Sequence, residues 1–387
     1  MSFWLVTGIL VVLYAAGLLY LRRGFALLPR PMAFSKTTPL PRVTVVVSLH
    51  NEARNVDRLL RALLNQEYPS NRLEFILVDD RSTDNTHALL QQWSQRDPRI
   101  RILRIVETPP DFAPKKYALQ QAVQQATGDI ILQTDADGRP LPRWVKQMVA
   151  YFTPEVGVVL GYAPYRTEPP FHAWWYQILA LEYCSNAAIA MATTGFQQPA
   201  TAIGTNLAYR KAVFQQVDGY GKFRAIPSGD DDLFVQRVRR HTRWKFAFAA
   251  HPDAAVWNDP PASFRQFYFQ RLRFASKGFL YPKPLVAILT TFYLMNLLLF
   301  IGPVLAMFTT LPFTPWLLLY LLKMGAEWRF LSAICGCFQQ QDLLTVLPIA
   351  SMLHIPYVLY FGAAAQFKEY RWKDITGKGS LNYFSSN

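Results

Sequence analysis

Two aspartates one residue apart, Asp135 and Asp137, follow an apolar run in the stretch GDIILQTDADGRPLP, residues 128–142. The run has the composition of a buried strand, and the glycine and prolines after the aspartates end it. In a parallel α/β sheet, ligands bind outside the carboxyl ends of the strands. Carboxylate oxygens at that point suit Mg²⁺ or Mn²⁺, ions that commonly hold phosphate groups. A solvated acidic turn is the competing interpretation.

A second acidic cluster, residues 230–232, directly precedes an apolar helical pattern that begins at Leu233. Adjacent carboxylates repel one another, and a helix N-terminus partly offsets that cost. Helix capping needs only one aspartate, so the cluster is also a candidate for chemistry. The neighbouring lysines Lys115 and Lys116 precede another helical pattern and could reach phosphates as point charges. An exposed lysine pair before a helix is the commoner explanation.

The elements that would position these residues alternate between strand and helix from residue 43 to about 165. Apolar, β-branched runs predict strands at 43–47, 75–78, 100–106 and 129–134. The segments between them have helical patterns, so we predict an α/β fold with a mostly parallel sheet. No Gly-x-Gly-x-x-Gly or Walker lysine motif occurs, which argues against a dinucleotide-binding or P-loop site.

Apolar segments flank this α/β region. Residues 3–21 form a nearly uncharged run of about the length that a bilayer requires. Arg22, Arg23 and Arg30 follow it, and by the positive-inside rule they place the next domain in the cytoplasm. No clean cleavage site follows, so we expect a retained anchor at residues 1–22 and a linker at 23–42.

The C-terminal third has a similar character. Residues 285–311 and 343–367 are clear candidate spans. Residues 315–338 are apolar but contain Lys323, Glu327 and Arg329, so they are either a third span with an internal ion pair or an interfacial or re-entrant helix. We therefore expect two to three spans within residues 285–367. The basic tail at 368–387 favours a cytoplasmic C-terminus, which four full spans in the whole chain would not allow.

Composition agrees with a membrane protein. The 387 residues carry a formal net charge of +14, yet 51% are hydrophobic and only 17% are charged. A basic surface of this kind suits anionic lipid. We do not expect nucleic-acid binding, because the basic residues are spread between apolar segments. The three cysteines are too few for a disulfide framework, so we expect them to be structural. Residues 171–192 are either a core helix or a helix lying on the membrane.

Five motifs in order along residues 43–277 resemble those of the family 2 glycosyltransferases, which have the GT-A fold. VSLHNE (47–52) is similar to V-x-x-x-N-E, VDDRSTDNT (78–86) to V-D-D-x-S-x-D-x-T, and TDAD (134–137) to Asp-x-Asp. SGDDDL (228–233) resembles T-E-D-x-D-L, with Gly229 where Glu is usual. QRLRF (270–274) resembles Q-x-x-R-W, with Phe274 in place of Trp. The resemblance implies a Rossmann-like GT-A domain, which we expect to span residues 43–284.

This resemblance implies inverting transfer of a sugar from a nucleotide-diphosphate donor, such as a UDP- or GDP-sugar. A divalent ion on Asp137, supported by Asp135, would neutralise the departing diphosphate. Asp79 or Asp80 would lie near the nucleoside. Asn51, Glu52 and Lys115 complete the expected donor site.

Inversion requires one base to remove the acceptor proton, and the motif match makes Asp230 that base. Asp232 would orient a neighbour or cap the helix. Arg273 would contact the diphosphate, and Gln270 the acceptor or donor. Phe274 keeps a stacking face but lacks the indole N–H of tryptophan, which weakens a processive interpretation.

We therefore expect one transfer onto a lipid or lipid-linked acceptor, by a multi-pass protein of the bacterial cell membrane whose catalytic domain is cytoplasmic. A processive polysaccharide synthase of the same family is the first alternative. A metal-dependent phosphohydrolase is another, although it would be expected to use histidine ligands. A non-catalytic membrane protein that keeps the fold for binding is the last.

Overall fold

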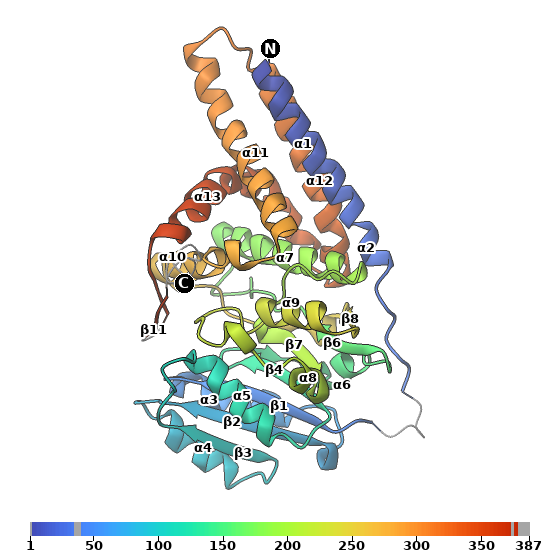
Figure 1. The fold of residues 1–387 in the computed structure, drawn as a ribbon, viewed down its shortest axis with the longest axis vertical. Helices are drawn as coiled ribbons and strands as arrows, with labels where there is room; N and C mark the ends of the chain where they lie inside the picture. The colour runs from blue at the N-terminus through green and yellow to red at the C-terminus, as the bar shows by residue number, and fades with distance from the viewer. Residues whose placement is uncertain (1, 35–39, 373–374, 378–387) are drawn as a thin grey trace. The chain divides into compact units, whose positions relative to one another are not determined.

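The computed structural model describes residues 2–34, 40–372 and 375–377 (Figure 1). The chain divides into two compact units. An α/β unit comprises Gly24–Arg166 and Asn186–Asp259. A helical unit comprises Met1–Arg23, Thr167–Ser185 and Pro260–Asn387.

The α/β unit is built on a seven-stranded sheet with the order β3-β2-β1-β4-β7-β6-β8. Its strands are β1 (Val43–Leu49), β2 (Leu73–Asp80), β3 (Ile100–Ile105), β4 (Ile130–Asp135), β6 (Val156–Leu160), β7 (Leu207–Arg210) and β8 (Lys245–Phe248). Strands β1 to β4 are mutually parallel, β7 is antiparallel to both of its neighbours, and β6 and β8 are parallel. The predicted α/β class with a mostly parallel sheet is confirmed.

Helices cover the sheet because its central strands are apolar on both sides. Helix α3 (Ala53–Leu64) packs four buried aliphatic residues into a core that also contains alternate residues of β1, β2 and β4. Helix α5 (Pro114–Gln125) contacts β1 and β2 with buried residues outside that core, which places it on the opposite face. The unit also contains helices α2 (Arg23–Ala26, mostly in this unit), α4 (Thr86–Ser94), α6 (Trp144–Val149), α8 (Lys211–Gln216) and α9 (Asp232–His241).

Four segments of this unit meet at the side chain of Asn206, which is fully buried. Its Nδ2 donates to the carbonyl oxygens of Tyr162 and Ala254, each at 2.7 Å. Its Oδ1 accepts the indole N–H of Trp144 at 2.9 Å. The short antiparallel pair β5 (Arg139–Pro140) and β9 (Val256–Trp257) joins the segment just before Trp144 to the segment just after Ala254. Asn206 thereby connects the segment after β6, helix α6 and the turn before β9 to the start of β7.

The helical unit contains α1 (Ser2–Leu21), the first half of α7 (Trp174–Gly195) up to Ser185, α10 (Phe264–Ala275), α11 (Lys283–Phe308), α12 (Thr314–Cys337) and α13 (Leu347–Phe367). Within the described residues, three stretches are long and apolar enough to cross a membrane: Phe3–Ala26, Lys283–Phe308 and Gln341–Phe367. They correspond to the N-terminal and the two clear C-terminal segments predicted from sequence. A short hairpin, β10 (Tyr370–Trp372) and β11 (Ile375–Gly377), follows α13. Residues 373–374 and 378–387 of the basic tail lie outside the described part.

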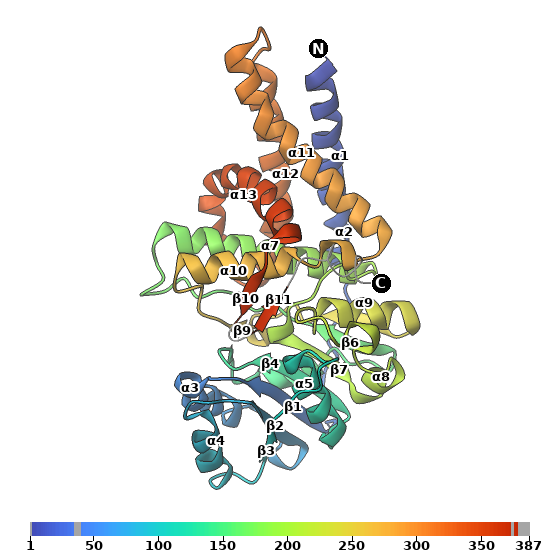
Figure 2. The same cartoon turned by 60° about the vertical axis from the view of Figure 1, so that its left-hand side comes forward.

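Helix α12 corresponds to residues 315–338, for which the sequence allowed either a third span or an interfacial or re-entrant helix. It packs against α1 along its length (Figures 1 and 2). Its Lys323 Nζ lies 2.6 Å from Glu327 Oε1 and is fully buried. Ser351 of α13 donates to Glu327 Oε2 at 2.5 Å, and Tyr14 of α1 donates to Oε1 at 3.0 Å. The internal ion pair is therefore present, and it connects α12 to two other helices.

Helix α7 combines features of both interpretations offered for residues 171–192. Its first residues, Trp174 and Trp175, are more than half exposed. Later residues pack inside the helical unit, where Cys184 Sγ lies 3.9 Å from Cys335 Sγ. All three cysteines are free thiols, as expected for structural residues.

We predict that Asn206→Asp lowers the stability of the chain by about 3 kcal/mol, because a carboxylate would face two carbonyl oxygens that need a donor. The melting transition of the purified protein in detergent measures this effect. The matched control is Asn71→Asp, since Asn71 is exposed. An equal melting temperature for the two variants would contradict the role assigned to Asn206.

Candidate active site

Three of the sequence motifs come together at one edge of the sheet. Strand β1 lies between β2 and β4, with Leu49 opposite Asp79 and Ser48 opposite Asp135. The residues after β1 and the last residues of β2 and β4 therefore lie at the carboxyl ends of adjacent parallel strands. This is the edge at which sheets of this type bind ligands.

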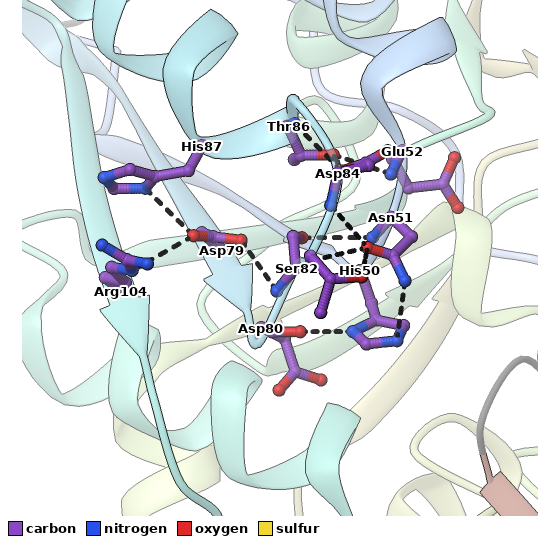
Figure 3. Close-up of polar contacts among 11 residues, drawn as sticks. His50, Asn51, Glu52, Asp79, Asp80, Ser82, Asp84, Thr86, His87 and Arg104 are labelled. Atoms are coloured by element: carbon purple, nitrogen blue, oxygen red, sulfur yellow. Dashed lines mark hydrogen bonds and ion pairs between the residues drawn. The ribbon is translucent and has the colours of Figure 1, made fainter.

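The loop after β1 is tied to the loop after β2 (Figure 3). Asn51 has φ of 53°, a left-handed conformation that asparagine tolerates better than most residues. Its Oδ1 accepts the N–H of Thr83 at 2.8 Å, and its own N–H donates to Ser82 Oγ at 3.1 Å. The N–H of Glu52 donates to Thr86 Oγ1 at 2.8 Å. Asn51 thus fixes the shape of both loops.

Asp84 completes this connection between the loops. Its Oδ2 accepts the N–H of Ala53 at 3.1 Å, and its Oδ1 accepts both the N–H and the hydroxyl of Thr86. Burial raises the pKa of the Asp84 carboxyl, but the hydrogen bonds outweigh it, so the pKa lies below its ordinary value. Asp84 is therefore ionised at neutral pH and holds the start of α3.

Asp79 is fully buried beneath these loops (Figure 3). Its Oδ2 lies 3.0 Å from His87 Nδ1 and 3.7 Å from Arg104 Nε, and its Oδ1 accepts the N–H of Ser82 at 3.3 Å. Asp80 is also buried and pairs with Arg81 at 2.8 Å. His50 Nδ1 donates to the carbonyl oxygen of Asp80. The two aspartates at the end of β2 thus have different basic neighbours.

The central feature of the edge is Lys115, near the start of α5. Its Nζ lies 2.7 Å from Asp135 Oδ1 and 3.0 Å from Asp230 Oδ2. Gln133 Nε2 donates to the same Oδ2 of Asp230 at 3.0 Å, and Thr205 Oγ1 donates to Asp135 Oδ2 at 2.6 Å. One ammonium group therefore joins the first acidic cluster of the sequence to the second.

The opposite charges of Lys115 and Asp135 stabilise each other. Burial lowers the pKa of Lys115, but Asp135 and Asp230 outweigh it and hold the pKa above its ordinary value. Burial and Asp230 raise the pKa of Asp135, yet Lys115 and Thr205 bring it below its ordinary value. At neutral pH, Lys115 and Asp135 are both charged.

Lys116 turns away from this cluster. It is 1% exposed, and its Nζ donates to the carbonyl oxygens of Phe223 at 2.7 Å and Ser228 at 2.9 Å. The expectation of an exposed lysine pair is therefore wrong. Both lysines point inward, and Lys116 holds the loop that leads to Asp230.

The rest of the second acidic cluster forms the start of α9. Asp231 accepts the N–H of Asp232 at 2.7 Å and that of Gly204 at 2.9 Å, and Asp232 accepts the N–H of Leu233 at 2.7 Å. Gly229 has φ of +85°, and a Cβ there would lie 2.6 Å from the Leu233 side chain. The backbone thus requires glycine at the position where the family motif has glutamate.

Asp137 lies beyond the end of β4 and is exposed. Its carbonyl oxygen accepts a hydrogen bond from Arg58 Nη2 at 3.3 Å. In the described part of the chain, no group of three or more His, Cys, Asp or Glu side chains is assembled as a metal site. The residues still fit Mg²⁺ or Mn²⁺, because such ions are commonly held by one or two carboxylates together with substrate phosphates.

Gln270, Arg273 and Phe274 lie on α10, in the helical unit. The Arg273 guanidinium lies over the ring of Phe274, which stacks on Tyr183. Arg271, between the motif positions, is 1% exposed, donates to Gln270 Oε1 at 2.7 Å and pairs with Glu182 of α7. Because α10 belongs to the helical unit, the structure does not place these three residues at the sheet edge.

Sequence reasoning missed His87, Arg104, Gln133 and Thr205. His87 carried a signal, because it directly follows the V-D-D-x-S-x-D-x-T motif, whereas Arg104 carried none, because its pairing with Asp79 depends on the register of β2 and β3. Gln133 precedes the Asp-x-Asp on the same strand. Thr205 had no such signal, since its approach to Asp135 depends on the placement of β7.

Residues 44–218 match the model of glycosyl transferase family 2. The probable glycosyltransferase YdaM of Bacillus subtilis is 26% identical over 248 residues, which are 61% of this chain and 55% of YdaM. A beta-monoglucosyldiacylglycerol synthase of Synechocystis sp. is 32% identical over 118 residues, which are 30% of this chain and 24% of the synthase.

In fold, the chain is similar to the mannosyltransferase PcManGT from Pyrobaculum calidifontis, solved in complex with GDP-Man and Mn²⁺. The TM-score is 0.54 at 21% sequence identity, and the match covers 91% of this chain and 99% of PcManGT. The chain spans about half or less of the length of the curated relatives described above.

The fold and the motifs at the sheet edge define a GT-A domain. Residues 44–218, the region that matches glycosyl transferase family 2, contain three of the five motifs found in the sequence.

We predict that Lys115→Met destabilises the chain by about 2–3 kcal/mol at pH 7, because it leaves two carboxylates unpaired. Without the lysine, mutual repulsion raises the pKa of the carboxylate pair above the ordinary value near 3.9. Protonation then relieves the repulsion as the pH falls. The deficit in melting temperature relative to the parent protein should therefore narrow from pH 7 to pH 5.

Lys146→Met is the control, since Lys146 is an exposed lysine on α6. A deficit that stays constant or widens on acidification would contradict the ion-pair arrangement.

Proposed function

We propose that this protein is an inverting glycosyltransferase that moves a sugar from a nucleotide-diphosphate sugar to a membrane-associated lipid or lipid-linked acceptor. The observation that carries the proposal is the Asp135–Lys115–Asp230 cluster at the carboxyl edge of a family 2 sheet. The proposed catalytic domain, residues 43–284, faces the cytoplasm. The anchor at 1–22, the spans within 285–367 and the tail at 368–387 hold it to the membrane.

The nucleoside of the donor, from a UDP- or GDP-sugar, binds beside β2. Asp79 accepts hydrogen bonds from the base or the ribose, and His87 and Arg104 hold its carboxylate in place. Asn51 and Glu52 shape the loop above it through their bonds to residues 82–86. Asp80 supports the same loop through Arg81 and His50.

The diphosphate lies beyond the end of β4, where Asp137, supported by Asp135, would hold Mg²⁺ or Mn²⁺. The ion would neutralise the charge that develops on the leaving group. PcManGT, with the same fold, was solved with GDP-Man and Mn²⁺. Lys115 places a permanent positive charge beside Asp135, and Arg273 contacts the departing phosphates in the assembled site.

Asp230 removes the proton from the acceptor hydroxyl as the sugar is transferred. Lys115 and Gln133 both bind its Oδ2, which fixes the orientation of the carboxylate. Lys116 positions the preceding loop, and Asp232 holds the start of α9. Gln270 and Phe274 contact the acceptor from α10.

The acceptor is a lipid because the part of the chain that the structure describes carries three stretches able to cross a membrane. The Synechocystis relative is named for the synthesis of a glucosyldiacylglycerol, an acceptor of this class. We favour one transfer per acceptor over processive synthesis, since two or three C-terminal spans are few for a polymer channel.

A panel of donors tests this function. Purified protein in detergent, with Mn²⁺ or Mg²⁺, is assayed for nucleotide release from UDP- and GDP-sugars, with and without bacterial lipid extract. Metal-dependent release that rises with lipid supports the proposal. Polymer growth without lipid would indicate a polysaccharide synthase, and absence of nucleotide-sugar binding by folded protein would indicate a non-catalytic role.

We predict that Asp230→Asn retains donor and metal binding but lowers the transfer rate by roughly 10²–10⁴-fold, because only the base is removed. Donor binding is measured by calorimetry and transfer by nucleotide release. Asp218→Asn, at an exposed left-handed position of the same unit, should leave both unchanged. Undiminished turnover in Asp230→Asn would remove Asp230 from the base role.

We predict that Asp137→Ala abolishes the dependence of donor binding on Mn²⁺, since the exposed carboxylate that would hold the ion is gone. The measurement is donor affinity with and without Mn²⁺. Glu155→Ala removes a carboxylate that is 66% exposed on the same unit and should keep the metal dependence. Metal dependence that persists in Asp137→Ala would place the ion elsewhere.

A further inference from the structure

The helical unit has an apolar groove between α11 and α13, with a volume of about 490 Å³. Phe300 of α11 lines it together with Leu359, Ala363, Ala364 and Phe367 of α13. The two helices are among the stretches able to cross a membrane. An apolar groove on such helices is suited to an acyl chain.

One end of the groove carries a cluster of hydrogen-bond donors. Lys368 Nζ lies 3.2 Å from the hydroxyl of Tyr360 and 3.3 Å from that of Tyr268, and the two hydroxyls are 3.3 Å apart. An ammonium group has three N–H donors, and each hydroxyl accepts only one of them in this arrangement. The cluster therefore has N–H and O–H groups to offer to an acceptor, together with a positive charge.

The polar cluster and the apolar walls of the groove follow one another as the headgroup and the acyl chains of a phospholipid do. Lys368 directly follows Phe367, the last residue of a stretch able to cross a membrane, so it stands where headgroups begin. The apolar walls belong to the stretches themselves. A phosphodiester carries negative charge and only acceptor oxygens on its phosphate, which complements one lysine and two tyrosine hydroxyls.

We propose that this groove binds an anionic phospholipid, with its phosphate on Lys368, Tyr268 and Tyr360 and one acyl chain along Phe300 and Ala363. The site does not depend on the sugar transfer proposed above. Tyr268 lies on α10, the helix that also carries Gln270 and Arg273. The bound headgroup therefore contacts the helix that bears the Q-x-x-R motif.

Native mass spectrometry of the full chain in detergent tests the proposal. The protein is titrated with phosphatidylglycerol or phosphatidylcholine of identical acyl chains. We expect the parent protein to prefer phosphatidylglycerol, and Lys368→Gln to weaken its binding by about fivefold, the effect of one positive charge near a lipid headgroup. Ala363→Trp fills the groove and should weaken the binding of both lipids.

Lys283→Gln is the matched control, because Lys283 is exposed at the start of α11 and the substitution removes the same charge as Lys368→Gln. Its lipid binding should equal that of the parent. Equal binding of the two lipids by the parent, or an equal loss in Lys283→Gln and Lys368→Gln, would overturn the proposal. Lys368 is exposed, so its substitution keeps the test valid even if Ala363→Trp does not fold.

Discussion

The α/β unit depends on a single ammonium group held between two carboxylates. Asp135 ends β4 and Asp230 precedes α9, and without a cation between them two acidic groups would meet in a largely buried space. Lys115 resolves this conflict, Thr205 binds the other oxygen of Asp135, and Gln133 binds the same oxygen of Asp230 as Lys115. The same arrangement brings the two acidic motifs of the sequence together at the carboxyl edge of the sheet.

Much of the architecture could be read from the sequence because it follows from local patterns. β-branched runs located β1 to β4, and parallel pairing placed their carboxyl ends together without further information. The link between Asp135 and Asp230 could not be read in this way. It requires β7 to enter the sheet antiparallel beside β4, and no local pattern specifies that pairing.

The lysines of α5 show a related limit. The sequence around Lys115 and Lys116 indicated the start of a helix, but it did not show that both lysine side chains point inward. Lys116 is buried because two carbonyl oxygens of the loop at residues 223–228 replace its hydration. Gly229 shows the converse: the sequence reveals its departure from the family motif, but only the left-handed backbone gives the physical reason.

The ion pair within α12 has a consequence for how the chain is assembled and handled. Lys323 and Glu327 are one helical turn apart, so they neutralise each other as soon as α12 forms, but their remaining hydrogen-bond partners come from α1 and α13. Helix α13 is synthesised after α12, so nascent α12 lacks one of those partners until α13 emerges. The N-terminal helix supplies the other through Tyr14. Truncated versions that omit it would lose an internal partner of Glu327 as well as a stretch able to cross a membrane.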